Sequence, residues 1–126
     1  MKVLLVEDDP VLRAVLKQFF TLKGHEATEA EDGKQGLTLL SGENVPDLIV
    51  TDIMMPKMNG YEMIEAIRSH PRLQRIPIII ITAGKIDDEK FAASGASEIY
   101  QKPIPLQQLL ERAEALVNQV YPNSQT

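Results

Sequence analysis

The stretch LIVTDIMMPKMNGYE, residues 48–62, passes from an apolar run into a turn and then into a polar, helix-like segment. Asp47–Thr51 is short, apolar and rich in β-branched side chains, which predicts a buried strand. Asp52 follows where that run ends, and Asn59-Gly60 predicts a turn before a helix over Tyr61–His70. The stretch therefore predicts one strand–loop–helix unit with a carboxylate at the end of its strand.

The same alternation occurs five times along the chain. The expected strands are Lys2–Val6, His25–Ala30, Asp47–Thr51, Pro77–Ile81 and Glu98–Gln101. The expected helices run from Pro10 to Gly24, over Lys34–Leu40, over Tyr61–His70, within a segment before Gly95, and from Leu106 to Val120. Such alternation predicts a parallel sheet with helices on both faces. The chain has 126 residues, too few for a barrel of ~250, so an open doubly wound sheet is expected.

Length and composition predict one domain over residues 1–121, followed by a frayed polar tail over residues 122–126. The absence of cysteine excludes disulfides, thiol catalysis and Cys-type zinc sites. A net charge of -5 argues against direct nucleic acid binding. No apolar run approaches the ~20 residues of a membrane span, and the acidic N-terminal segment does not fit a signal peptide. We therefore expect a cytoplasmic chain with no membrane insertion, whereas its oligomeric state is open.

Acidic side chains follow two of the expected strands. Glu7 and Asp8 come after the first strand, and Asp52 comes after the third. Ligands of open α/β sheets bind at the carboxyl ends of strands, and neighbouring strands lie ~5 Å apart. Three carboxylates so close would repel unless a cation joined them, and oxygen ligands of this kind suit Mg²⁺. Asp9 is better placed to cap the helix that begins at Pro10, although it remains an alternative acid.

Two further polar side chains follow the fourth and fifth expected strands. Thr82 is expected just after the fourth strand and Lys102 just after the fifth. A carboxylate, a metal, an ammonium and a hydroxyl together are what phosphoryl transfer requires, because its catalysis is mostly positioning and charge neutralisation. Asp52 could then be a nucleophile that forms an acyl phosphate.

These residues lie in motifs that resemble those of the receiver domains of two-component response regulators. The matching motifs are VEDD at 6–9, TDIMMPKMNG at 51–60, ITA at 81–83 and KP at 102–103. Each motif alone is weak, whereas the ordered set is specific and covers nearly the whole chain. The resemblance implies a flavodoxin-like five-stranded sheet in the order 2-1-3-4-5, as in single-domain regulators of the chemotaxis type.

The resemblance also implies a role for each site residue. Asp52 matches the phosphorylated Asp, Thr82 the switch hydroxyl, and Lys102 the Lys that contacts the phosphate. The implied ligands of Mg²⁺, or of Mn²⁺ in its place, are Glu7, Asp8, Asp52 and the backbone carbonyl of Met54. The Lys102–Pro103 bond is expected to be cis. The implied partners are a histidine kinase or a histidine phosphotransfer protein as donor, and a downstream effector protein. Such a domain is a phosphoacceptor that catalyses its own phosphorylation and dephosphorylation, and is not an enzyme for a separate substrate.

The sequence departs from the family pattern at the output side. Ile99 occupies the place of the aromatic residue that changes rotamer on activation, and strand alternation turns the adjacent Tyr100 to the opposite face. Either the output face signals differently, or Tyr100 substitutes through a local bulge. The segment after Thr82 is shorter than in most receivers, which predicts a short or distorted fourth helix. Met54 and Gly84 are expected to flank the path of the water that removes the phosphate.

Other functions fit the residues less well. A pseudo-receiver, which binds partners without phosphorylation, is the alternative that the departure at Ile99 keeps open. A phosphatase of the dehalogenase type needs a second Asp where Met54 stands, and a cap for which the chain has no room. A flavin or nucleotide site needs a Gly-rich loop after the first strand, where this chain has VEDDPV.

Overall fold

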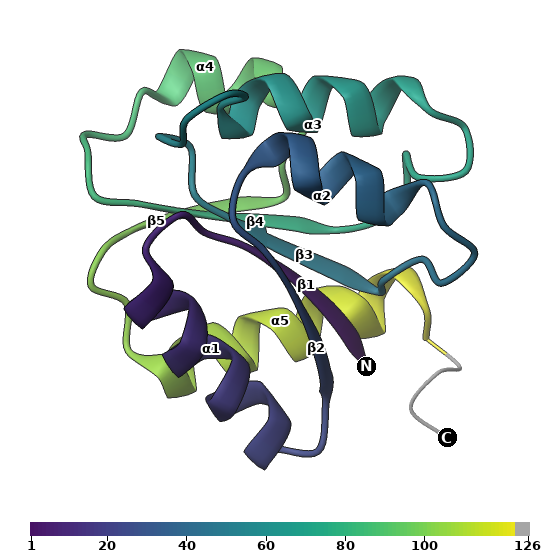
Figure 1. Cartoon of the computed structure of the whole chain (residues 1–126), viewed down its shortest axis with the longest axis vertical. Coiled ribbons are helices and arrows are strands. Elements are labelled where there is room, and N and C mark those ends of the chain that lie inside the picture. The colour runs from purple at the N-terminus through teal and green to yellow at the C-terminus, as the bar shows by residue number, and fades with distance from the viewer. Residues whose placement is uncertain (123–126) are drawn as a thin grey trace.

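Five strands and five helices alternate along residues 1–122, the part of the chain that the computed structural model describes. The strands are β1 (Lys2–Val6), β2 (Glu26–Ala30), β3 (Leu48–Thr51), β4 (Ile78–Thr82) and β5 (Glu98–Gln101). The helices are α1 (Pro10–Leu22), α2 (Gly33–Leu40), α3 (Gly60–Ser69), α4 (Asp88–Ser94) and α5 (Leu106–Val120). All strands are parallel in the order β2-β1-β3-β4-β5, so the predicted fold class and strand order are confirmed (Figure 1).

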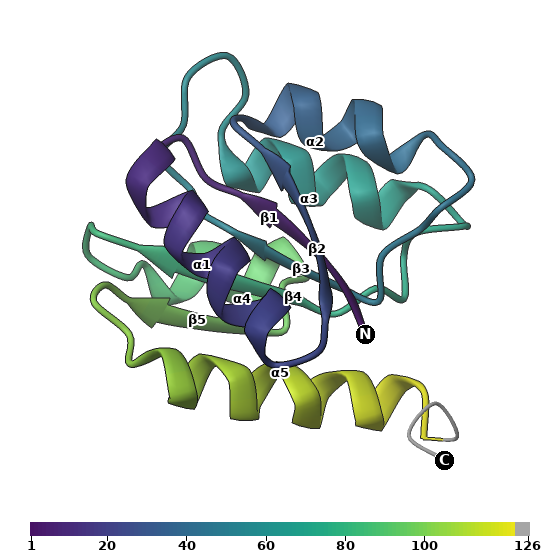
Figure 2. The same cartoon turned by 60° about the horizontal axis from the view of Figure 1, so that its bottom comes forward.

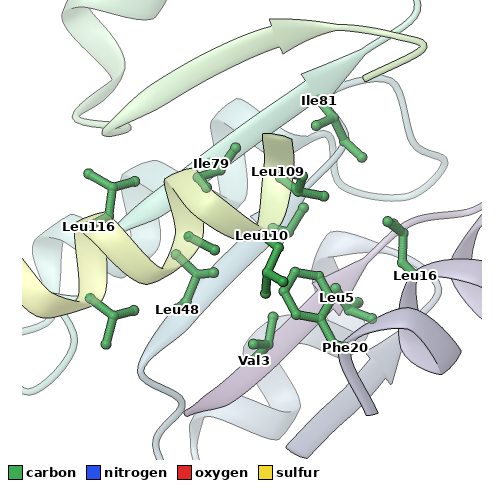
Figure 3. Close-up of a cluster of buried hydrophobic side chains, with 13 residues drawn as sticks. Val3, Leu5, Leu16, Phe20, Leu48, Ile79, Ile81, Leu109, Leu110 and Leu116 are labelled. Atoms are coloured by element: carbon green, nitrogen blue, oxygen red, sulfur yellow. The ribbon is translucent and has the colours of Figure 1, made fainter. Parts of the chain in front are cut away.

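The helices cover the two faces of the sheet unequally. Helices α1 and α5 lie on one face, and α2, α3 and α4 lie on the other (Figures 1 and 2). The side chains of successive strand residues point to opposite faces, so each strand contributes to two hydrophobic clusters. The first cluster joins β1, β3 and β4 to α1 and α5, with Phe20 and Leu110 side by side between the two helices and the sheet (Figure 3). The second cluster joins the same strands to α2 and α3.

Local sequence signals set most of the helix ends. The Asp9 carboxylate accepts hydrogen bonds from the backbone N–H groups of the first turn of α1, which confirms the predicted cap. Asn59 and Glu62 form a reciprocal capping box at the start of α3. Helix α3 ends at Ser69, one residue earlier than predicted, because Pro71 favours extended backbone at His70.

Three strands begin or end one residue away from the predicted positions. Strand β3 begins at Leu48, and the Asp47 carboxylate just before it accepts the N–H of Lys2 at 2.7 Å. His25 lies outside β2, and its ring contacts both the N-terminal ammonium and Glu114. Thr82 was expected just after β4 but is its last residue, because it pairs with Gln101 of β5.

Helix α4 is short, as predicted, and it is only loosely packed. It has seven residues and none of them is buried, although Phe91 partly covers the second cluster. Asp87 caps its N-terminus, and Gly95 ends it in the left-handed conformation. The Arg68 side chain of α3 donates to the carbonyl of Gly95 at 2.8 Å. The main fixed attachment at the end of α4 is therefore a polar one.

None of the helices in residues 1–122 combines the length and the apolar character that crossing a membrane requires.

Candidate functional site

The register of the sheet brings the ends of β1 and β3 together. Val6 pairs with Thr51, and the N–H of Asp52 donates to the carbonyl of Val6 at 3.0 Å. The next residue on each strand is an acid, because Glu7 follows Val6 and Asp52 follows Thr51. The two acids are therefore neighbours at the carboxyl edge of the sheet, which is where open α/β sheets bind ligands.

Three acids form a cluster at this edge. Glu7, Asp8 and Asp52 each offer a carboxylate oxygen, and these oxygens lie within 4.8 Å of one another. Glu7 and Asp52 are 1% and 5% exposed, whereas Asp8 is exposed to solvent. Acids buried this closely need a positive charge beside them.

The Lys102 ammonium supplies that charge in the structure. Its Nζ donates to Oε1 of Glu7 at 2.6 Å and to Oδ2 of Asp52 at 2.8 Å. Burial lowers the pKa of Lys102, but its hydrogen bonds to the two acids outweigh burial and leave that pKa raised. Burial raises the pKa of Glu7 to about 7, and the nearby charge of Asp52 adds to the increase, while the Lys102 hydrogen bond opposes it.

Lys102 binds one oxygen of the Asp52 carboxylate, and the loop that follows Asp52 binds the other oxygen. Asp52 Oδ1 accepts the backbone N–H groups of Ile53 at 2.6 Å and Met54 at 3.3 Å. Gly60, the first residue of α3, packs directly against this loop, and its N–H donates to the carbonyl of Ile53 at 2.8 Å. A Cβ at Gly60 would lie 2.2 Å from the carbonyl oxygen of Asp52, so this close approach requires glycine.

Lys102 contacts two of the acids, and Thr82 is joined to Lys102 at the end of the β4–β5 pair. Thr82 is buried, and its Oγ1 accepts the N–H of Gly84 at 3.2 Å. The N–H of Lys102 donates to the carbonyl of Thr82 at 2.7 Å, and the Lys102–Pro103 bond is cis as expected. Met54 is 71% exposed. A Cβ built on Gly84 would lie 3.8 Å from both the Met54 sulfur and Thr82 Oγ1, so these two groups flank Gly84.

In β5, where Ile99 replaces the aromatic residue of the family pattern, Ile99 and Tyr100 lie on opposite faces of the sheet. Ile99 packs against the second cluster, on the side of α3 and α4, whereas Tyr100 packs against the first cluster, on the side of α5. The Tyr100 hydroxyl donates to the Glu98 carboxylate, which also accepts hydrogen bonds from Arg112 of α5. The Arg112 hydrogen bond lowers the pKa of Glu98. Tyr100 therefore does not take the place of an aromatic at Ile99.

Two features of the site were not predicted from the sequence. Asn59-Gly60 was predicted as a turn, but the close approach of Gly60 to Asp52 was not. Arg13 was not singled out, although its Nη1 donates to the backbone carbonyl of Glu7 at 2.7 Å. Helical spacing placed Arg13 on α1 but carried no signal for this contact.

The donor set fits a hard divalent cation. It consists of carboxylate oxygens from Glu7, Asp8 and Asp52, with no nitrogen or sulfur ligand. The position of Lys102 shows that two of these acids already share a bound positive charge in the protein. A cation there would oppose the effects of burial and of the nearby Asp52 charge, which raise the pKa of Glu7.

Comparisons with known proteins agree with this arrangement. The sequence model described as the response regulator receiver domain matches residues 3–114. The chain is 32% identical over 125 residues to response regulator MprA of Mycolicibacterium vanbaalenii, and the alignment covers 98% of this chain and 53% of that protein. The chain thus spans about half the length of the curated relatives that it matches.

Solved structures with the same fold include a Francisella response regulator receiver domain, with a TM-score of 0.84 and 31% identity over 94% of this chain and 97% of that one. Another is the receiver domain of a sensor histidine kinase from Pseudomonas aeruginosa, with a TM-score of 0.85 and 28% identity over 93% of this chain and 97% of that one. That second structure contains a magnesium ion coordinated in its active-site cleft.

Proposed function

The chain belongs to the response regulator receiver domain family, and we propose from this that Asp52 accepts a phosphoryl group in a Mg²⁺-dependent reaction. The observation that carries the proposal is the contact of Lys102 with both Glu7 and Asp52, at 2.6 Å and 2.8 Å. It gathers an acceptor carboxylate, a metal-binding acid and a cation from three separate strand ends. Phosphoryl transfer needs this combination of nucleophile and positive charge.

Asp52 is the nucleophile. Its Oδ1 is bound by two backbone N–H groups, which fixes the orientation of the carboxylate. Its Oδ2 faces Lys102 and forms the new bond to phosphorus. The bond between phosphorus and the donor breaks in the same transfer, and the leaving group keeps the electron pair and takes up a proton. The product is an acyl phosphate on Asp52.

Lys102 and Thr82 act on the transferred group. The Lys102 ammonium leaves Asp52 Oδ2 and binds a phosphoryl oxygen. The positive charge that stabilises the free carboxylate then stabilises the transferred phosphoryl group. The Thr82 hydroxyl at the end of β4 donates a hydrogen bond to another phosphoryl oxygen and links phosphorylation to the β4–α4 loop. Ile99, partly buried against the second cluster, has no aromatic ring that could change rotamer with that movement, so the output face signals differently from that of most receivers.

Glu7, Asp8 and Asp52, with the backbone carbonyl of Met54, would hold the Mg²⁺ ion, and Mn²⁺ could replace it. The ion supplies positive charge that neutralises the phosphoryl oxygens during transfer. Glu7 and Asp8 reach the site from the end of β1, whereas Asp52 and Met54 reach it from the end of β3, so residues of both strands would hold the ion.

The donor is a histidine kinase or a histidine phosphotransfer protein, and a downstream effector protein receives the signal. This assignment rests on the family and on the acceptor chemistry of Asp52. The net charge of -5 supports a protein partner rather than direct nucleic acid binding. We also assign the protein to the cytoplasm, where the phosphorylating domains of such kinases have their ATP.

The test is the intact mass of the protein after treatment with acetyl phosphate, with and without Mg²⁺. We expect a single phosphoryl adduct that needs Mg²⁺ and that is absent from the Asp52→Asn variant. The matched control is Asp47→Asn, which changes an acid at the opposite end of β3 and should keep the adduct. An adduct that persists in Asp52→Asn would contradict the assignment of the acceptor.

The absence of any adduct would have two explanations, and beryllofluoride separates them. Beryllofluoride binds an intact acceptor site as a stable mimic of the phosphoryl group. Its binding would show a working receiver whose acyl phosphate is hydrolysed too fast to trap. A failure of beryllofluoride to bind in the presence of Mg²⁺ would favour the pseudo-receiver, a module that binds partners without phosphorylation.

A further inference from the structure

The loop between β1 and α1 carries two of the three clustered acids, and the Arg13 side chain binds the backbone of this loop. Arg13 of α1 donates from Nη1 to the backbone carbonyl of Glu7 at 2.7 Å. The backbone N–H of Arg13 donates to the carbonyl of Asp9 at 2.9 Å. The second of these is the first hydrogen bond of helix α1, whereas the first is a contact that only the Arg13 side chain makes with the loop.

The guanidinium is itself fixed by a residue of the neighbouring strand. Arg13 Nε lies 3.5 Å from Oε1 of Glu29 on β2, and the Arg13 side chain is only 17% exposed. Lys17, one turn further along α1, lies 3.5 Å from the other oxygen of Glu29 and is far more exposed. Lys17 shares the carboxylate with Arg13, and within residues 1–122 its ammonium contacts Glu29 and makes no hydrogen bond to the loop.

The carbonyl that Arg13 binds is well placed to orient a metal ligand. The carbonyl group of Glu7 and the N–H of Asp8 belong to the same peptide unit, which is planar. Holding that carbonyl therefore fixes the plane from which the Asp8 side chain leaves the backbone. Asp8 is the exposed acid of the cluster, so its position depends on its backbone more than on surrounding side chains.

We propose that Arg13 is a positioning residue for divalent cation binding, which acts by fixing the Glu7–Asp8 peptide so that both carboxylates face Asp52. The inference rests on the proposed function, since it concerns the same metal site. Groups that orient metal ligands from outside the coordination sphere commonly contribute about tenfold or more to metal affinity. Arg13 has this role through a backbone carbonyl rather than through a ligand side chain.

A positioning role for Arg13 can be distinguished from a purely electrostatic one, because the two change the affinity for Mg²⁺ in opposite directions. Removing a positive charge near an acidic site should strengthen the binding of Mg²⁺, because the site becomes more negative. The positioning role predicts weaker binding when Arg13 is replaced. Replacing Lys17 offers a matched control, because it also removes one positive charge beside Glu29, whereas Lys17 makes no hydrogen bond to the loop within residues 1–122.

The experiment titrates Mg²⁺ alone into the folded chain and follows backbone amide shifts by NMR, since the chain has no Trp for fluorescence. We expect Arg13→Met to raise the Kd for Mg²⁺ about tenfold, and Lys17→Met to leave the Kd unchanged or slightly lower. Arg13→Lys keeps one donor for the carbonyl and should give a Kd between those of wild type and Arg13→Met. Equal Kd values for Arg13→Met and Lys17→Met would overturn the inference.

Two further results keep the test decisive. If Arg13→Met does not fold, Arg13→Lys carries the test, because it keeps the positive charge and removes the guanidinium that contacts both Glu29 and the Glu7 carbonyl, and it should still raise the Kd. A Kd that is unchanged in Arg13→Lys would then overturn the inference. If wild type itself does not bind Mg²⁺, the proposed function fails; if wild type binds and the Arg13 variants bind equally well, only the positioning role fails.

Discussion

Glu7 is nearly completely buried, and burial raises its pKa from the ordinary 4.5 to about 7. Between these two pH values the folded protein without metal holds a proton on Glu7 that the unfolded chain has lost. The free energy of unfolding therefore falls as the pH rises from 4.5 through 7. The contribution of Glu7 is fully present below its unfolded pKa and is lost above about pH 7.

This titration gives a prediction for the protein in EDTA. Urea unfolding should show that Glu7→Gln gains stability relative to wild type as the pH rises from 5 to 8, because the amide stays neutral. The relative gain should reach about 3 kcal/mol at most, from the size of the pKa shift. Comparing the two proteins at each pH cancels the other titrating groups. A stability difference that does not change with pH would show that Glu7 titrates normally.

The β3–α3 loop is the element that places Asp52, and its shape depends on the absence of a side chain at Gly60. A Cβ there would lie 2.2 Å from the carbonyl oxygen of Asp52 and 2.9 Å from Cα of Ile53. Both are backbone atoms, so the contact cannot be relieved by rotating a side chain. We expect Gly60→Ala to destabilise the fold by about 3 kcal/mol or more in thermal or urea unfolding, and to reduce phosphorylation of Asp52.

Gly84 provides the control for Gly60 at the same edge of the sheet. A Cβ at Gly84 would meet only the Met54 sulfur and Thr82 Oγ1, each at 3.8 Å, which is ordinary contact. Gly84→Ala should therefore change stability by less than about 1 kcal/mol. Similar losses for the two variants would contradict the role that we assign to the Gly60 contact.

Helix α4 is held by Arg68 more than by apolar packing. The Arg68 guanidinium donates to the carbonyls of Gly95, Gln74 and Ile76, at 2.8, 2.9 and 2.8 Å, and its burial lowers its pKa. Arg68→Met keeps the length of the side chain but removes these donors. We expect faster amide hydrogen exchange throughout α4, with a loss of about 2 kcal/mol in global stability.

Arg72 is the matched control for Arg68, because its guanidinium donates to the carbonyls of Leu40 and Gly42 after α2. In Arg72→Met, faster exchange should be confined to the segment after α2, and α4 should exchange as in wild type. If α4 responds equally to both substitutions, its attachment does not depend on Arg68.

The whole molecule shows which properties follow from sequence pattern and which do not. The gathering of Glu7, Asp52 and Lys102 at one edge follows from the alternation of strands and helices, because parallel strands end on the same side, whereas the strand order followed only from the family resemblance. The opposite faces of Ile99 and Tyr100 follow from strand alternation in the same way. Element ends were less predictable, since β2, β3 and β4 each begin one residue later than expected.

Contacts of the backbone between separate elements could not be predicted from the sequence pattern. The bond from Arg13 to the Glu7 carbonyl joins a helix to a loop whose path only the fold defines. The fit of Gly60 against Asp52 depends on how closely two backbones approach, which residue type alone does not reveal. The raised pKa of Glu7 likewise reflects burial, because a strand-end acid can equally well face water.

The division of the core by the sheet also bears on how the chain folds during synthesis. Every buried member of the second cluster lies between Leu4 and Ile80, so that side can close while later residues are still being added. Five of the thirteen buried residues of the first cluster come from α5. Because chains emerge from the ribosome N-terminus first, the part of this face that α1 does not cover stays exposed until α5 has been translated.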